Sequence, residues 1–278
     1  MKKKVAFQGI LGSFSSVAAT AIFGAEITAV HTKRFRDIFA LVSSGEAEFG
    51  VVPMENALAG SLQENTDLLR EHNCWICSEY YCPVQLALLS KGRQSEIRLV
   101  FSHPKAFEQC SSFLESNPQI RAVVWSDTAT AAQHVAAQDD PSLAAIAGEQ
   151  AAAIYSLPVC NRSIQNHQHN ATRFIAVSAR PIDCPNATKC SIIVKLPHRP
   201  GSLSFFLGEI ASHELNITKI ESRPILGKPF ETAFLIDIEK TASSTTELAQ
   251  VIPVLSTKAQ DLRLLGLYNA QQIPRATR

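Results

Sequence analysis

Short apolar runs alternate with segments of helical periodicity through the first two thirds of the chain. The apolar runs are typical of buried strands and lie at 4–7, 49–52, 98–101, 121–125 and 143–147. Helix-like segments follow at 13–22, 61–71, 129–137 and 149–155, and a further helix is expected to begin at Pro104. Strands that alternate with helices predict right-handed crossovers and a mainly parallel sheet.

Residues that favour a helix start follow three of these runs: Ser13 or Ser15, Ser102 or His103 with Pro104, and Asp127 or Thr128. Parallel strands place their exit loops at one edge of a sheet, where ligands bind. The side chains expected at this edge are Ser13, Asn56, Ser102, His103 and Thr128. Hydroxyl and amide groups at helix N-termini favour a small anion.

The pattern changes beyond a proline-containing linker at 181–189. Strands are predicted at 191–196, 217–220, 230–238 and 262–267, helices at 203–211 and 246–255, and a turn at Gly227-Lys228-Pro229. This βαββαβ order is typical of a ferredoxin-like unit. The sequence therefore predicts an α/β protein with two parts, residues 1–180 and 189–270.

Composition excludes several classes of protein. With 278 residues, 46% of them hydrophobic, the chain is long enough to bury a sizeable core. A net charge of +1 gives no basic surface for nucleic acid or an anionic membrane. Polar residues interrupt the uncharged run 5–25, so we expect neither a secretory signal nor a membrane span.

Cysteine usage points to a reduced, cytoplasmic compartment. The chain has seven cysteines, an odd number, and no secretion signal. Cys74-Trp75-Ile76-Cys77 has redox-motif spacing, but no helix starts after Cys74 to lower a thiol pKa. No second Cys/His pair stands at zinc-ligand spacing, so we expect no metal.

The segment 170–174 places a hydroxyl, a guanidinium and an aromatic ring side by side. The preceding run 165–170 is polar throughout, whereas 174–177 has the pattern of an inner strand. Taken alone, the segment fits a loop that enters a sheet, with Thr172 favoured by its β-propensity and Arg173 solvated.

Further segments change this interpretation, because together with Asn170-Ala171-Thr172-Arg173-Phe174 they resemble prephenate dehydratases in order and spacing. They are Val5-Ala6-Phe7-Gln8-Gly9-Ile10-Leu11-Gly12-Ser13-Phe14-Ser15, Gly50-Val51-Val52-Pro53-Met54-Glu55-Asn56, Ser102-His103-Pro104-Lys105-Ala106-Phe107-Glu108-Gln109-Cys110 and Glu221-Ser222-Arg223-Pro224. The resemblance implies a two-lobed, periplasmic-binding-protein-like catalytic domain at 1–180, with a second lobe at about 80–160. It also implies an amino-acid-sensing ACT domain of ferredoxin-like fold at 189–270, and a monofunctional enzyme.

The implied reaction is the decarboxylative dehydration of prephenate to phenylpyruvate in phenylalanine biosynthesis, without a metal or organic cofactor. The catalytic residues carried over from the family are Thr172, Glu55, Asn56, Arg173 and Gln109. The substrate-binding residues carried over are Gly12, Ser13, Phe14, Ser102, His103, Thr128 and Phe174.

We expect the Thr172 hydroxyl to hydrogen-bond the leaving oxygen, although an alcohol is a weak acid and needs a relay. Glu55 supplies the proton only if burial keeps it protonated; if ionised, it orients Asn56 or nearby amides. Arg173 follows Thr172 directly, so on a strand it faces the other way, and a structural role is as well supported as substrate contact. His103 either caps its helix or donates to substrate.

The resemblance also implies feedback inhibition by L-phenylalanine, bound between two copies of the C-terminal unit, in a homodimer or homotetramer. The effector residues carried over are Gly201, Ser202, Leu203, Asn216, Glu221, Ser222, Arg223 and Pro224. Ser202 and Ser204 depart from the family's usual Gly-Ala-Leu-Val segment, so an altered response is expected.

Two alternatives remain open on the sequence. Arogenate dehydratase uses a substrate with an amino group in place of the keto oxygen, and a comparison of the two substrates discriminates between them. A non-catalytic ligand-sensing protein would have no need of the Thr172 hydroxyl at a leaving group.

Overall fold

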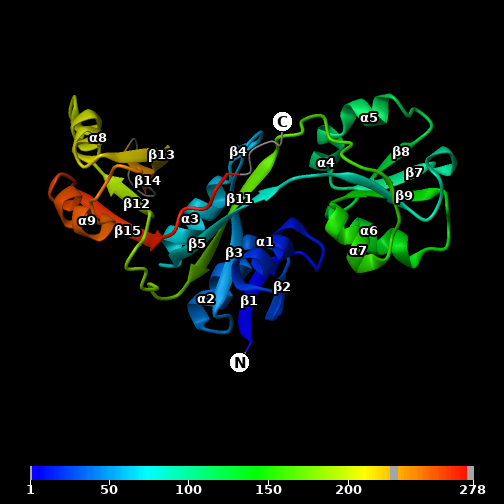
Figure 1. Ribbon diagram of the computed structural model, residues 1–278, viewed down its shortest axis with the longest axis horizontal. Coiled ribbons are helices and arrows are strands. Elements are labelled where there is room, and N and C mark those ends of the chain that lie inside the picture. The colour runs from blue at the N-terminus through cyan, green and yellow to red at the C-terminus, as the bar shows by residue number, and fades with distance from the viewer. Residues whose placement is uncertain (1, 226–230, 274–278) are drawn as a thin grey trace. The chain divides into compact units, whose positions relative to one another are not determined.

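The computed structural model describes residues 2–225 and 231–273, and the chain divides into two compact units (Figure 1). Within these ranges, the first unit holds residues 2–72, 80–175 and 272–273, and the second holds 73–79, 176–225 and 231–271. The expected turn Gly227-Lys228-Pro229 and the first predicted residue of the next strand, Phe230, lie outside the described residues.

A first sheet has the strand order β2-β1-β3-β11-β5, and the short β4 pairs with β3. Its strands are β1 (Lys3–Gln8), β2 (Ile27–Thr32), β3 (Phe49–Asn56), β4 (Gly60–Ser61), β5 (Trp75–Pro83) and β11 (Ala171–Ser178). Strand β1 runs parallel to both β2 and β3. The helices that contact this sheet are α1 (Phe14–Phe23), α2 (Phe35–Ser44) and α3 (Gln63–Glu71).

A second sheet has the strand order β10-β6-β9-β7-β8. Its strands are β6 (Ala87–Ser90), β7 (Leu99–Ser102), β8 (Arg121–Val124), β9 (Leu143–Ala147) and β10 (Val159–Asn161). Strand β7 is parallel to β8 and β9, whereas β6 is antiparallel to β9 and β10. A 3-10 turn, η1 (Gln94–Glu96), precedes β7.

Helices cover both faces of the second sheet. In Figure 1, α4 (Pro104–Gln109) and α5 (Ser111–Glu115) lie on one side of β7, β8 and β9, and α6 (Thr128–Ala137) and α7 (Glu149–Tyr155) lie on the other. The hydrophobic cores on the two faces show the same division. Ala106 and Cys110 pack with Leu88 and Val100, whereas the buried alanines of α6 and α7 pack with Phe101 and Leu89.

The α/β class is confirmed, but the prediction of one mainly parallel sheet is wrong. The chain builds mixed sheets, in which β6 is antiparallel to both of its neighbours. Residues expected at a single edge therefore lie on different sheets, with Ser13 and Asn56 beside the first and Ser102, His103 and Thr128 beside the second.

The three predicted helix caps are found. The side chains of Ser13, His103 and Asp127 accept hydrogen bonds from backbone amides in the first turns of α1, α4 and α6. Pro104 occupies the first turn of α4, where its missing N–H costs no hydrogen bond. Within the described ranges, none of the helices has the length and apolar character to cross a membrane.

The second unit shows the predicted βαββαβ element order. Its elements are β12 (Lys189–Lys195), α8 (Ser202–Ser212), β13 (Leu215–Pro224), β14 (Thr232–Lys240), α9 (Leu248–Thr257) and β15 (Asp261–Tyr268). The antiparallel strands follow the order β13-β14-β12-β15. Strand residues such as Ile192 and Ile236 pack with Phe206 and Ile210 of α8 and with Leu255 of α9.

The other face of this sheet is polar and buried. Lys189, Ser191 and Asp237 are each at most 2% exposed. The segment 73–79 lies against this face, because Arg263 donates to the Cys74 carbonyl and a Cβ on Gly266 would lie 2.0 Å from the Ile76 carbonyl oxygen. A chain segment distant in sequence therefore completes the second unit.

Candidate active site and effector pocket

Thr172 lies on β11 beside Asn56, the last residue of β3. The Asn56 Nδ2 donates to Thr172 Oγ1 at 3.0 Å and to Asn170 Oδ1 at 2.8 Å, with the Ala171 carbonyl oxygen 3.2 Å away. Both Thr172 and Asn56 are partly exposed, whereas Asn170 is buried. A hydroxyl is thus fixed at the end of two strands where solvent or a ligand can reach it.

The Asn56 side chain is fully engaged within the protein. Its Oδ1 accepts hydrogen bonds from the Leu58 and Ala59 amides at 3.0 and 2.9 Å. A carboxamide has only two N–H hydrogens, and three acceptors on β11 or just before it already face them. The structure therefore argues against Asn56 as a donor to a substrate carboxylate and supports a role in holding Thr172.

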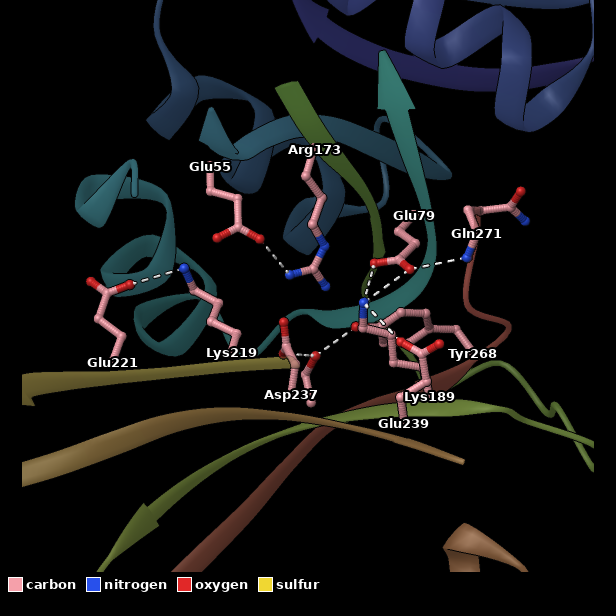
Figure 2. Close-up of polar contacts among 11 residues, drawn as sticks. Glu55, Glu79, Arg173, Lys189, Lys219, Glu221, Asp237, Glu239, Tyr268 and Gln271 are labelled. Atoms are coloured by element: carbon pink, nitrogen blue, oxygen red, sulfur yellow. Dashed lines mark hydrogen bonds and ion pairs between the residues drawn. The ribbon is translucent and has the colours of Figure 1, made fainter. Parts of the chain in front are cut away.

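Glu55 and Arg173 form an ion pair beside this amide network (Figure 2). Arg173 Nη1 lies 3.3 Å from Glu55 Oε1, and the Arg173 side chain is 3% exposed while that of Glu55 is 31% exposed. Neighbouring residues on a strand face opposite sides, so Arg173 is buried where Thr172 is accessible. This contact gives the Glu55 carboxylate a partner within the protein, which favours the orienting role over the relay.

The Gly12 and Ser13 amides are also engaged. The Gly12 amide donates to Ser16 Oγ at 3.0 Å, and the Ser13 amide donates to the Ile10 carbonyl at 3.1 Å. The structure argues against these two amides as carboxylate donors. Phe14 instead packs against the core of the second sheet.

Close packing around Gly12 leaves little room for a side chain at this position. Its φ is +90°, and a Cβ would lie 3.3 Å from both the Ala151 Cα and the Tyr155 ring. Tyr155 also donates from its hydroxyl to the Leu11 carbonyl at 2.6 Å. The loop after β1 therefore contacts α7 closely, and only glycine fits without a shift.

The predicted residues beside the second sheet are mostly engaged in structure. Ser102 is 0% exposed and donates from Oγ to the Ile146 carbonyl at 2.7 Å, so its hydroxyl is not presented to a ligand. The His103 Nδ1 caps α4 by accepting from the Lys105 amide at 3.2 Å. Thr128 is the partly exposed first residue of α6. The Gln109 carbonyl accepts from the Asn166 amide at 2.7 Å.

The structure therefore brings Glu55, Asn56, Thr172 and Arg173 together, through the contacts of Asn56 with Thr172 and of Glu55 with Arg173. Phe174 is 3% exposed and belongs to the core. Asn170 was absent from the predicted site, although it opens the same Asn-x-Thr-Arg-Phe segment. Its polar side chain just before a buried strand was the available signal.

The second unit contains a hollow of about 730 Å³. Its lining residues are Lys195, Leu196, Pro197, His198, Arg199, Ser202, Leu203, Ser222, Glu231, Thr232, Phe234 and Gln260. Three predicted effector residues, Ser202, Leu203 and Ser222, are among them. Gly201, with φ of +84°, is the N-cap residue of α8 and directly precedes Ser202.

The predicted effector residues on β13 are divided between its two faces. Ser222 is paired with Phe234, and both line the hollow. Glu221 points to the opposite face, where its carboxylate lies 3.3 Å from Lys219 Nζ (Figure 2). The same carboxylate lies 4.0 Å from Arg223 Nη1. The side chains of Glu221 and Arg223 therefore do not form the wall of the hollow.

Two further predicted effector residues lie outside the lining. Asn216 is paired with Glu239 near the other end of β13, and Pro224 ends the strand opposite Thr232. In the described part of the chain, no group of three or more His, Cys, Asp or Glu side chains is placed to share a metal ion.

Comparisons with known proteins are consistent with this arrangement. A family model described as prephenate dehydratase matches residues 5–182. The chain is 32% identical over 277 residues to a bifunctional chorismate mutase/prephenate dehydratase of Enterobacter agglomerans, covering 97% of this chain and 71% of that protein. It is 36% identical over 280 residues to arogenate dehydratase/prephenate dehydratase 2 of Arabidopsis thaliana, covering 95% and 72% respectively.

Two solved structures are similar along nearly the whole chain. A prephenate dehydratase from Arthrobacter aurescens in complex with L-Phe has a TM-score of 0.81 and 29% identity, covering 96% of this chain and 89% of its own. A protein described as GqqA, a novel type of quorum quenching acylase, has a TM-score of 0.83 and 29% identity, covering 96% and 98%.

Proposed function

Because this chain belongs to the prephenate dehydratase family, whose members are hydro-lyases that act on prephenate, we propose that it converts prephenate to phenylpyruvate with Thr172 at the reacting centre. The observation that carries this proposal is the Thr172 hydroxyl, which is partly exposed and held by Asn56 at 3.0 Å. Catalytic acids need this combination of fixed geometry and access.

The proposed reaction breaks two bonds of the substrate ring. The ring carbon–oxygen bond breaks and its electron pair leaves with the oxygen, to which Thr172 donates a hydrogen bond. The hydroxide that departs takes a proton from the solvent and becomes water. The bond to the ring carboxylate breaks, carbon dioxide leaves, and its electron pair completes the aromatic ring. A positioned proton donor contributes roughly 10²–10⁴-fold to such a step.

Glu55 and Arg173 support this site rather than perform the proton transfer. Their ion pair joins the end of β3 to β11, the two strands that carry Asn56 and Thr172. The ion pair thereby fixes the spacing of the Asn56 and Thr172 side chains, which must remain in contact. Holding reacting groups within a fraction of an ångström is a large part of catalysis when the chemistry itself needs no cofactor.

We assign this reaction to a catalytic domain at 1–180, with two lobes of periplasmic-binding-protein type built on the two sheets. Residues 189–270 are proposed as an ACT domain, supported by the βαββαβ order and the strand order β13-β14-β12-β15. The segment 73–79 packs with the ACT-like sheet and belongs with it structurally.

L-phenylalanine is the proposed effector, bound in the hollow lined by Ser202, Leu203 and Ser222. The support is the hollow itself, together with the Arthrobacter aurescens relative, whose structure contains L-Phe. Apolar lining from Leu203 and Phe234 suits an aromatic ring. We propose that the complete effector site forms between two copies of the ACT domain, in a homodimer or homotetramer.

The experiment is a steady-state comparison of Thr172→Ala, Thr172→Ser and the parent protein with prephenate and with arogenate. We expect the alanine variant to lose kcat far more than it raises KM, and the serine variant to retain substantial activity. An alanine variant within a few-fold of the parent removes Thr172 from the mechanism. Absence of turnover of either substrate by the parent protein favours a ligand-sensing role.

A further inference from the structure

Asn170 is buried at 4% exposure and makes the shortest of the three contacts of the Asn56 amide nitrogen. It is two residues before Thr172, and β11 begins between them at Ala171. The Asn170 Oδ1 accepts from Asn56 Nδ2 at 2.8 Å. Asn170 is therefore linked to Thr172 through Asn56.

The hydrogen-bond pattern fixes which way the Asn56 carboxamide faces. Its oxygen accepts from the Leu58 and Ala59 amides, and its nitrogen donates to Asn170 and Thr172. A flipped carboxamide would place its oxygen against the Asn170 oxygen and its N–H groups against two backbone N–H donors. Asn170 therefore holds the nitrogen end of the Asn56 carboxamide, and the two backbone amides hold its oxygen end. Both contacts stabilise the same orientation of this group.

This orientation limits where the Thr172 hydroxyl hydrogen can point. Because Oγ1 accepts from Asn56, its own hydrogen must lie in a staggered position away from Nδ2. Among the residues that the structure describes, the hydroxyl has this one hydrogen bond and its hydrogen meets no protein acceptor. An accepted hydrogen bond also polarises a hydroxyl and strengthens it as a donor by about 10–30%.

We propose that Asn170 is a positioning residue of the reaction: through Asn56 it holds the Thr172 hydroxyl as an acceptor toward the protein, so that its hydrogen is donated to the oxygen that leaves the substrate. This inference rests on the proposed function, since it needs a leaving oxygen near Thr172. Asn170 itself does not touch the reacting atoms.

The test compares Asn170→Leu, which has a similar branched shape and no acceptor, with Asn170→Asp, which keeps an acceptor at the same place. We expect Asn170→Leu to lower kcat by about tenfold, the equivalent of one hydrogen bond made by a reacting group, with a smaller change in KM. Asn170→Asp should keep kcat within about threefold and raise KM, because its added charge repels an anionic substrate.

Asn166→Leu is the control, because Asn166 lies in the same polar run and its side chain makes three hydrogen bonds, with Glu108, Ser111 and Ser112. The Asn166→Leu variant should have a lower Tm than the parent, without a comparable loss of kcat. In a Thr172→Val background, Asn170→Leu should cause no further loss of kcat, because the hydroxyl that it positions is gone.

Equal losses of kcat in Asn170→Leu and Asn170→Asp would overturn the inference, as would a full additional loss in the Thr172→Val background. A parent protein that converts neither substrate would contradict the proposed function instead. A parent that converts prephenate, with Asn170→Leu equally active, would leave that function standing and refute only the role of Asn170.

Discussion

The Lys189 ammonium nitrogen lies 3.1 Å from both carboxylate oxygens of Glu79, and their side chains are 2% and 0% exposed (Figure 2). Glu79 Oε1 also accepts from the Gln271 amide at 3.1 Å, and Glu239 lies 3.9 Å from the same ammonium. This pair joins the segment 73–79 to the first strand of the sheet in the second unit.

We therefore predict that Lys189→Met strongly destabilises the protein, because it leaves the buried Glu79 carboxylate without its nearest cation. Removal of one partner of a buried pair costs about 3–5 kcal/mol of the free energy of unfolding. Urea unfolding measures the change. The double variant Lys189→Met, Glu79→Leu should recover much of the loss.

Lys91→Met is the control for this prediction, because Lys91 pairs at 4.0 Å with an Asp139 side chain that is fully exposed. Exposed pairs contribute little to stability. If Lys189→Met changes the urea midpoint no more than Lys91→Met does, the buried pair is not a major contributor.

Gly12→Ala should cost more stability than Gly45→Ala. The two glycines have φ of +90° and +78°, so an alanine is strained at both, by roughly 1–2 kcal/mol. Only Gly12 of the two lies against other residues, since an added methyl group would lie 3.3 Å from Ala151 and Tyr155, whereas nothing lies within 4 Å at Gly45. The difference in Tm between the variants measures the packing of this loop on α7, and equal values would show that this packing contributes nothing.

Ser222→Leu should weaken phenylalanine binding by about tenfold or more, because the larger side chain enters the hollow and displaces favourable contacts. Asn216→Leu is the matched change on the same strand, six residues away and outside the lining. Isothermal titration with phenylalanine compares the two variants with the parent. Similar affinities for all three proteins would place the effector elsewhere.

Burial raises the pKa of the Cys82, Cys110 and Cys190 thiols from 9.0 to about 12. The folded protein therefore keeps these protons when the unfolded chain has already lost them. Their contribution to the free energy of unfolding is complete below pH 9 and falls as the pH rises from 9 toward 12.

Urea unfolding at pH 7.5 and at a pH above 9 should therefore show lower stability at the alkaline pH. A variant with alanine at Cys82, Cys110 and Cys190 should show a weaker pH dependence than the parent, whereas Cys184→Ser, at a partly exposed thiol, should change it less. An unchanged slope in the triple variant would mean that other groups dominate the alkaline transition.

Sequence patterns were sufficient for most of the helices and for the buried strands, because each such element carries its own apolar signal. Strand β2 has no fully buried residue, so its pattern is weak. Helix α2 was missed although Ile38, Phe39 and Val42 are buried at helical spacing, a signal that was present in the sequence. The antiparallel pairing of β6 was not predictable, because strand direction depends on partners distant in the chain.

The sequence was sufficient to predict which residues form the candidate site, but not which hydrogen bonds they make. Asn56 and Thr172 were both selected, yet their contact joins positions 116 residues apart and redirects Asn56 from substrate to protein. The opposite orientation of Glu221 and Ser222 was available from strand alternation alone. Ser102 was ambiguous, because a serine at the end of a strand can face either the ligand edge or the core.

The interleaving of the two units limits how they can be exchanged between relatives. The second unit needs 73–79 as well as the long segment that begins at 176, and β5 and β11 each cross the boundary between the units. A gene fusion at a single point in the 181–189 linker would combine Glu79 from one parent with Lys189 from another. Recombination between family members should therefore yield stable chimeras only when both segments, or at least both members of that pair, are inherited together.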